Sequence, residues 1–115
     1  MTIKRFETGP RMSQAVVHNG TVYLAGQVAK GASVKEQTTA ILKQIDALLS
    51  AAGTDKSKLL SANIWLTDMS TFNEMNAVWE AWVSKGNTPA RATVESRLAA
   101  PDYLVEIACV CAVTD

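Results

Sequence analysis

The sequence predicts one α+β domain in which two helices pack on one face of a mixed β-sheet. Three observations lead to this prediction. Segments with strand-like apolar patterns stand before, between and after two segments with helical periodicity. The 115 residues, 48% of them hydrophobic, suit a single compact domain. No linker, repeat or low-complexity segment interrupts the chain, so we expect residues 1–115 to form one domain.

Three short strands are expected before the first helix. Residues 3–6 form a candidate first strand, and residues 14–18 and 21–25 form a candidate hairpin. The Asn19-Gly20 pair between the last two segments favours a tight turn, because both residues tolerate positive φ. Gly26 closes this region.

Two helices are predicted from apolar stripes of helical spacing. Ser33 and Glu36 match a capping box, so the first helix begins there, continues to about residue 52 and ends at Gly53. The second helix covers about residues 71–83. We interpret both stripes as core; they comprise Ile41, Ile45, Leu48 and Leu49 in the first helix and Phe72, Met75, Trp79 and Trp82 in the second.

Further strands are predicted at residues 59–67, 91–96 and 103–113, which gives the order β-β-β-α-β-α-β-β. Two helices cover one sheet face, and the other face needs a cover of its own. Since a domain of this size buries only about two-thirds of its chain surface, we expect identical subunits to supply that cover.

Charge and cysteine usage exclude several classes of protein. Eleven basic side chains balance eleven acidic ones without long runs, so we expect neither nucleic acid nor a membrane surface as a partner. Cys109 and Cys111 should share one strand face as a reduced, buried pair. His18 is the only histidine, so we predict no metal site. The N-terminus has no secretory pattern and residues 107–113 are the longest apolar run, so a cytosolic protein is expected.

Glu106 is the first candidate for chemistry, because it lies in the most apolar segment of the chain. If the last two strands form a hairpin centred between Leu98 and Ala99, Arg91 lies opposite Glu106. Two interpretations of this pair stay open. The pair either forms a structural ion pair, or Arg91 binds a substrate carboxylate while Glu106 activates water.

Two sequence segments resemble a known family. Pro89-Ala90-Arg91-Ala92-Thr93-Val94, followed by Glu106-Ile107, closely resembles the signature of the Rid/YjgF family of imine and enamine deaminases. The segment Ala25-Gly26-Gln27-Val28 resembles a second family motif, and the predicted order of elements agrees over essentially the whole chain.

This resemblance implies a chorismate-mutase-like homotrimeric barrel with sites between subunits and no cofactor. It also implies that Arg91 binds the substrate carboxylate and that Glu106 positions the attacking water. The implied reaction is hydrolysis of 2-enamine or 2-imine carboxylates, such as 2-aminoacrylate or 2-iminobutyrate. Its products are a 2-keto acid and ammonia.

The resemblance assigns five more residues to the substrate pocket, several of which depart from the family pattern. Thr93 stands where the family often has a cysteine, and Ala25, beside Gly26, stands where it usually has a serine. Arg11 and Met12 occupy the stretch in which family deaminases carry a tyrosine. Arg11 is either a second cation that favours dicarboxylates or a solvated loop residue.

Two other functions stay open. A trimer could bind small carboxylates such as keto acids through Arg91 without turnover, which the changed pocket residues favour. Alternatively, the chain acts on one aminoacrylate or aminomuconate-type compound in a particular pathway. A chorismate mutase is disfavoured because fold alone does not define a site, and a nuclease is disfavoured by the neutral charge.

Overall fold

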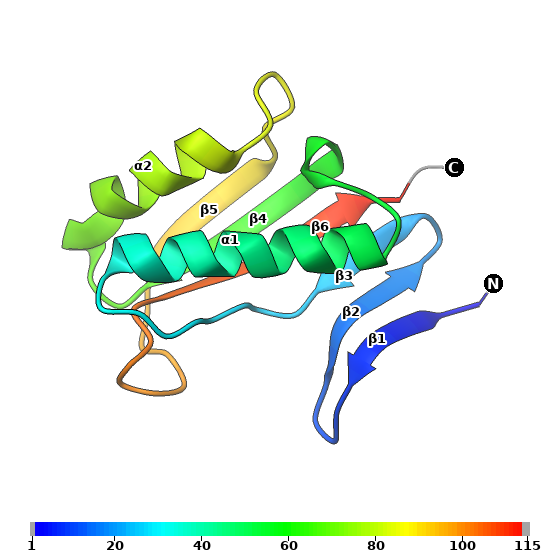
Figure 1. The fold of residues 1–115 in the computed structure, drawn as a ribbon, viewed down its shortest axis with the longest axis horizontal. Coiled ribbons are helices and arrows are strands. Elements are labelled where there is room, and N and C mark those ends of the chain that lie inside the picture. The colour runs from blue at the N-terminus through cyan, green and yellow to red at the C-terminus, as the bar shows by residue number, and fades with distance from the viewer. Residues whose placement is uncertain (1, 114–115) are drawn as a thin grey trace.

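The protein is a two-layer α+β structure in which both helices lie on the same side of a six-stranded sheet (Figure 1). The computed structural model describes residues 2–113. The helices are α1 (Val34–Ala51) and α2 (Phe72–Trp82), with short 3-10 turns at Lys56–Lys58 and Met69–Thr71. The strands are β1 (Lys4–Thr8), β2 (Ser13–His18), β3 (Thr21–Leu24), β4 (Leu59–Leu66), β5 (Ala90–Glu95) and β6 (Val105–Ala112). The predicted fold class and element order are confirmed.

The turn and cap signals of the sequence form as expected. Asn19 and Gly20 have φ of 52° and 72°, as a tight turn between β2 and β3 requires. Ser33 caps α1 by accepting a hydrogen bond from the Glu36 amide at 3.1 Å. Gly53 follows α1 with φ of 87°. Within residues 2–113, neither helix is long and apolar enough to cross a membrane.

The sheet order corrects one prediction. The strands follow the order β1-β2-β3-β6-β4-β5, so β4 lies between β5 and β6 and the last two strands are not a hairpin. β5 is parallel to β4, with Arg91 beside Ala62, whereas β6 is antiparallel to β4, with Glu106 beside Trp65. The prediction that Arg91 faces Glu106 across a hairpin is therefore wrong. α2 provides the crossover that a parallel β4–β5 pair needs.

Side-chain alternation along the strands defines two faces of the sheet. One face packs against the helices and carries the buried residues of β6, which are Val105, Ile107, Cys109 and Cys111. The neighbouring positions of β6, including Glu106 and Val110, point to the open face. Tyr23 pairs with Val110 and Val94 pairs with Trp65, so both share this open face, where they are 50% and 48% exposed.

The two cysteines are free and buried on the helix-facing side, as the sequence predicts. Desolvation by burial, with a smaller effect of the neighbouring Cys111 thiol, raises the pKa of Cys109 to about 12. Burial also raises the pKa of Cys111. Both thiols therefore behave as small core residues rather than as nucleophiles.

Gln37 is a buried polar residue that joins three segments of the chain. Its side-chain amide donates to the Gly31 carbonyl at 3.1 Å and to the Asp102 carbonyl at 2.9 Å. Its oxygen accepts from the Leu104 amide at 2.8 Å. Gln37 is fully buried, so these bonds are shielded from water. The residue thus ties α1 to the loop before it and to the chain that enters β6.

We expect Gln37→Leu to lower the free energy of unfolding by about 2–3 kcal/mol, because it leaves buried backbone groups without partners. Urea unfolding followed by circular dichroism measures this loss. Gln44→Leu is the matched control on the same helix, since the Gln44 side chain makes no hydrogen bond within residues 2–113, and it should change stability by less than about 0.5 kcal/mol. Equal losses in the two variants would contradict the role of Gln37.

Candidate active site

Arg91 lies on the edge strand β5 and points beneath α2. Its strand partner Ala62 is 2% exposed on the helix-facing side, so Arg91 points to that side as well. The guanidinium Nη1 donates to Asn76 Oδ1 at 2.7 Å. Because Asn76 is neutral, this bond fixes the guanidinium without neutralising its charge.

Two aromatic rings of α2 complete the surroundings of Arg91. The guanidinium carbon lies 5.7 Å from the centre of the Phe72 ring and 5.5 Å from that of Trp79. Both distances are within the range of cation–π attraction. Among residues 2–113, no Asp or Glu oxygen lies within 4.0 Å of the guanidinium. Arg91 is thus a half-buried cation, held by neutral groups, with unused donors for an anion.

Thr93 lies two positions after Arg91 and faces the same side of β5, beside the buried Ile64 of β4. Its Oγ1 atom is buried and has no hydrogen-bond partner within residues 2–113. This unpartnered buried hydroxyl, on the same strand face as Arg91, is a second polar group at this edge.

Glu106 lies on the opposite face of the sheet, where its carboxylate covers Gly26. A Cβ atom at Gly26 would come within 2.0 Å of Glu106 Oε2 and 2.9 Å of its Cδ. Glycine therefore leaves room for the carboxylate above it, and a larger residue would displace the end of the flexible Glu106 side chain. The positive backbone φ found at other glycines of the chain is not the reason at this position.

The segment that carries Gly26 bridges two strands. The Ala25 amide donates to the Gln14 carbonyl of β2 at 2.9 Å, and Gln27 exchanges two backbone hydrogen bonds with Ile107 of β6. These bonds hold Gly26 beside Glu106. Ala25, with only a methyl group, adds no polar side chain there.

Arg11 and Met12 form a third group at the turn between β1 and β2. They line an open cavity of about 500 Å³ whose other lining residues are Glu7, Gly9, Pro10 and Gln14. Both residues are exposed, and Met12 is exposed by 56%. This turn and the loop between β5 and β6 project from the same edge of the molecule (Figure 1).

The structure thus brings some predicted site residues together and separates others. Arg91 and Thr93 share one face of β5, and Gly26 lies under Glu106. Arg91 and Glu106 point to opposite faces of the sheet, so they do not converge within one chain.

The aromatic stripe of α2 packs in the core as predicted, with Trp79 buried and Phe72 packed against the core. Its contact with Arg91 is not apparent from the sequence, and neither is the role of Asn76. The signal is their spacing: residues 72, 76 and 79 share one helical face. A polar residue inside an aromatic stripe indicates that the stripe contacts a polar partner.

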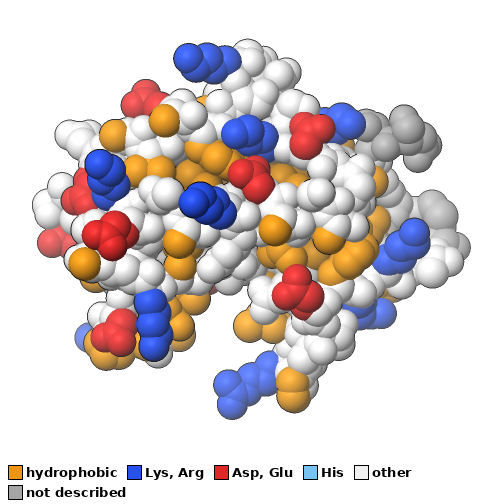
Figure 2. Space-filling model, in the orientation of Figure 1, with side chains coloured by type: hydrophobic (Ala, Val, Ile, Leu, Met, Phe, Trp, Pro, Cys, Tyr) orange, Lys and Arg blue, Asp and Glu red, His pale blue; other side chains and the backbone are white. Residues whose placement is uncertain are grey.

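The two separate groups support complementary chemistry. A rigid guanidinium with free donors binds a carboxylate through two parallel hydrogen bonds. A carboxylate at an open surface accepts a proton from water. Charged side chains of both signs are interspersed over the helix-bearing face, which carries no broad cationic field (Figure 2).

Comparison with known proteins places the chain in a family. The family model described as Endoribonuclease L-PSP matches residues 2–113. The RutC family protein YoaB of Escherichia coli K12 is 45% identical over 114 residues, which cover 98% of this chain and 100% of the relative.

Solved structures agree with this assignment. NMB1025, a YjgF-family protein from Neisseria meningitidis, is 47% identical with a TM-score of 0.98, and the match covers 100% of this chain and 98% of that one. The Rid-family protein YyfA from Yersinia pestis is 29% identical with a TM-score of 0.91, over 97% of this chain and 100% of that one. The resemblance found in the sequence is confirmed: the chain belongs to the YjgF/Rid/RutC family.

Proposed function

We propose that the protein is a cytosolic, cofactor-independent deaminase that hydrolyses 2-imine and 2-enamine carboxylates. The observation that carries this proposal is the guanidinium of Arg91, which is half-buried and has no carboxylate partner within residues 2–113. A structural ion pair would require an acidic neighbour, and Glu106 lies on the other sheet face. A bound substrate carboxylate is the partner that fits the free donors.

The separation of Arg91 and Glu106 supports a site built from two copies of the chain. Two groups on opposite faces of one sheet act on the same small molecule when different subunits supply them. The open sheet face, with Tyr23 and Val94 about half exposed, is available for such an association. We therefore propose a homotrimer with sites between subunits, in agreement with the family resemblance.

In the proposed reaction, Arg91 binds the carboxylate of the imine and Asn76 fixes the guanidinium. Glu106 from a second subunit accepts a proton from water, and the water oxygen attacks the imine carbon. The C=N electron pair moves to nitrogen, which takes up the proton held by Glu106 to give a carbinolamine. The hydroxyl of the carbinolamine then loses its proton to Glu106, which passes it to the amino group as the C–N bond breaks, leaving a 2-keto acid and ammonia. Binding the imine beside a held water provides the acceleration through proximity.

The changed pocket residues favour a second function, which is carboxylate binding without turnover. Ala25 has no hydroxyl beside Glu106, and the exposed turn carries Arg11 and Met12. Binding of a keto acid with no acceleration of imine hydrolysis would support this function. A deaminase restricted to one compound would instead act on a single member of a substrate panel.

Neutral substitutions at the two charged residues should separate binding from chemistry. Arg91→Ala should lower kcat/KM by about 100-fold, because it removes charge-assisted hydrogen bonds worth about 3 kcal/mol. Glu106→Gln should lower kcat by about 100-fold and leave the dissociation constant of the keto acid within about threefold. An amino-acid oxidase that generates imines from several amino acids, coupled to detection of keto acid, measures both variants. Arg97→Ala, in the exposed loop after β5, is the control. Wild-type activity in Arg91→Ala would contradict the proposal.

Gly26→Ala should act through Glu106. The new methyl group displaces the Glu106 carboxylate, whose terminal atoms can rotate away, so we expect a folded protein with kcat lowered to about the level of Glu106→Gln. The double variant should lose no further activity, because both changes remove the same group. Additive losses in the double variant would show that Gly26 acts independently of Glu106.

Mixed subunits test whether two copies form each site. Arg91→Ala and Glu106→Gln subunits, co-expressed with different tags and purified as hybrids, should regain activity at about a third of the sites, because each mixed trimer has one interface with an intact arginine and an intact glutamate. Each regained site takes its arginine from one variant and its glutamate from the other. Hybrids of Arg91→Ala with Arg91→Ala,Glu106→Gln subunits are the control and should remain inactive. If the first hybrids also stay inactive, the two residues do not meet between subunits.

A further inference from the structure

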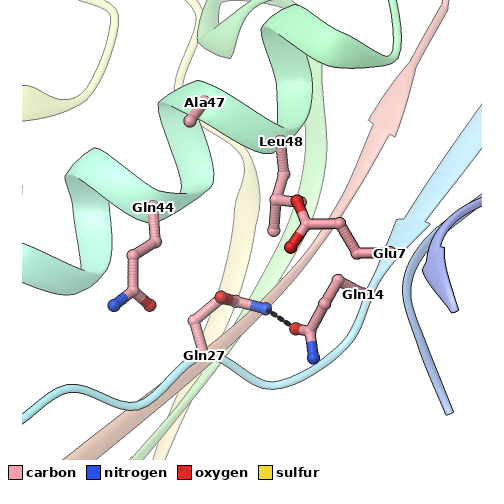
Figure 3. Close-up of a pocket in the computed structure, with 6 residues that line it drawn as sticks. All are labelled: Glu7, Gln14, Gln27, Gln44, Ala47 and Leu48. Atoms are coloured by element: carbon pink, nitrogen blue, oxygen red, sulfur yellow. Dashed lines mark hydrogen bonds between the residues drawn. The ribbon is translucent and has the colours of Figure 1, made fainter. Parts of the chain in front are cut away.

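A separate cavity of about 270 Å³ lies between α1 and the strands β1 and β2 (Figure 3). Neither Arg91 nor Glu106 lines it. Its lining residues are Glu7, Gln14, Gln27, Gln44, Ala47 and Leu48. At about 30 Å³ for each water, the cavity has room for a molecule with a few heavy atoms. Three glutamines and one glutamate around a small space indicate recognition of a polar ligand.

The hydrogen bonds of Gln27 fix which of its atoms faces the cavity. Its Nε2 donates to the Ala25 carbonyl at 3.0 Å and to Gln14 Oε1 at 2.9 Å. A carbonyl oxygen accepts and cannot donate, so the amide nitrogen must point toward Ala25. Both N–H groups of Gln27 are thereby used. Its Oε1 receives no hydrogen bond from residues 2–113 and is not among the buried atoms that lack a partner, so this oxygen is open to solvent although Gln27 as a whole is only 7% exposed.

Glu7 supplies the charge of the cavity. It is the one ionisable residue in the lining, which contains no Lys or Arg. Glu7 has φ of 50°, an uncommon conformation for a residue other than glycine, and its carboxylate extends toward Leu48 above Gln27 (Figure 3). The side chain of Gln44 descends from α1 toward the same space. The lining therefore carries one negative charge, on the exposed Glu7, and no positive charge.

Such a lining selects the chemistry of its ligand. The Glu7 carboxylate and the free Oε1 of Gln27 favour a cation that carries several N–H donors. Ala47 and the buried Leu48 form an apolar wall suited to a short alkyl group. An anion or a carboxylate ligand would be repelled by Glu7.

We propose that this cavity binds small primary ammonium ions, with the –NH₃⁺ group on Glu7 and Gln27 Oε1 and the alkyl group against Ala47 and Leu48. The ammonium ion has the same charge and N–H donors but no alkyl group to contact the apolar wall. The proposal does not depend on the deaminase reaction, because none of the residues assigned to carboxylate binding or water activation lines the cavity.

Titration followed by ¹H–¹⁵N NMR tests the proposal on the full chain. At constant ionic strength, ethylammonium should shift the side-chain amide signals of Gln14, Gln27 and Gln44 in a saturable way. Ammonium should give the same shifts with weaker affinity, because it lacks the alkyl group. Tetramethylammonium, which has no N–H donor, should give none. No saturable shift with ethylammonium, or equal shifts with tetramethylammonium, would overturn the proposal.

Substitutions locate the binding at this cavity. Glu7→Gln keeps the shape of the side chain and removes its charge, so affinity for ethylammonium should fall at least tenfold. Glu80→Gln, on the exposed face of α2, is the matched control and should bind as the wild type does. If Glu7→Gln fails to fold, Gln44→Leu is the substitute test. It removes one polar group from the side of α1, away from the β1–β2 turn, and should weaken binding severalfold. Unchanged affinity in both cavity variants would refute the site.

Discussion

Strand β4 hydrogen-bonds to β5 on one side and to β6 on the other, and this shared pairing determines where the reactive groups point. The register places Arg91 beside Ala62 and Glu106 beside Trp65, two β4 residues of opposite parity. The pleat therefore sends Arg91 under α2 and Glu106 to the open face. A one-residue slip in either pairing would reverse one of these directions and bury the wrong side chains. The core thus enforces the separation of the two charges, because Ile107 and Cys109 must stay under the helices.

The separation also leaves Arg91 without an acidic neighbour among residues 2–113, in a chain without net charge. The eleven positive and eleven negative side chains cancel, and no extended field attracts a ligand from a distance. The proposed recognition of a carboxylate relies on one guanidinium whose neighbours, Asn76, Phe72 and Trp79, are neutral. Such a site discriminates through geometry at short range, so its affinity should depend less on ionic strength than that of a broad basic surface.

Much of the fold follows from local patterns in the sequence, and the failure lies in one nonlocal pairing. Turn chemistry at Asn19-Gly20, the cap at Ser33 and the parity of Cys109 and Cys111 are local, and each is found in the structure. The partner of β5 is not local. Strands that follow one another in sequence usually pair, but here α2 returns the chain parallel to β4 and β6 enters on the far side. The family motif identified Arg91 and Glu106 without knowledge of the strand order. The directions of their side chains could be assigned only once the strand order was known. The contact of Asn76 with Arg91 could not be predicted, because a single polar residue within an aromatic helix face is also typical of an exposed position.

Gly26 shows that a glycine can be required by a neighbour rather than by its own backbone. Where φ suits any residue, replacing glycine with alanine commonly stabilises a protein by about 0.4–1 kcal/mol, because the unfolded chain loses freedom. At this position the same methyl group would occupy the space of the Glu106 carboxylate. Alanine at residue 26 would therefore combine a less flexible unfolded chain with a displaced Glu106 carboxylate in the folded protein. A single methyl group at this position would thus affect both the stability of the protein and the placement of Glu106.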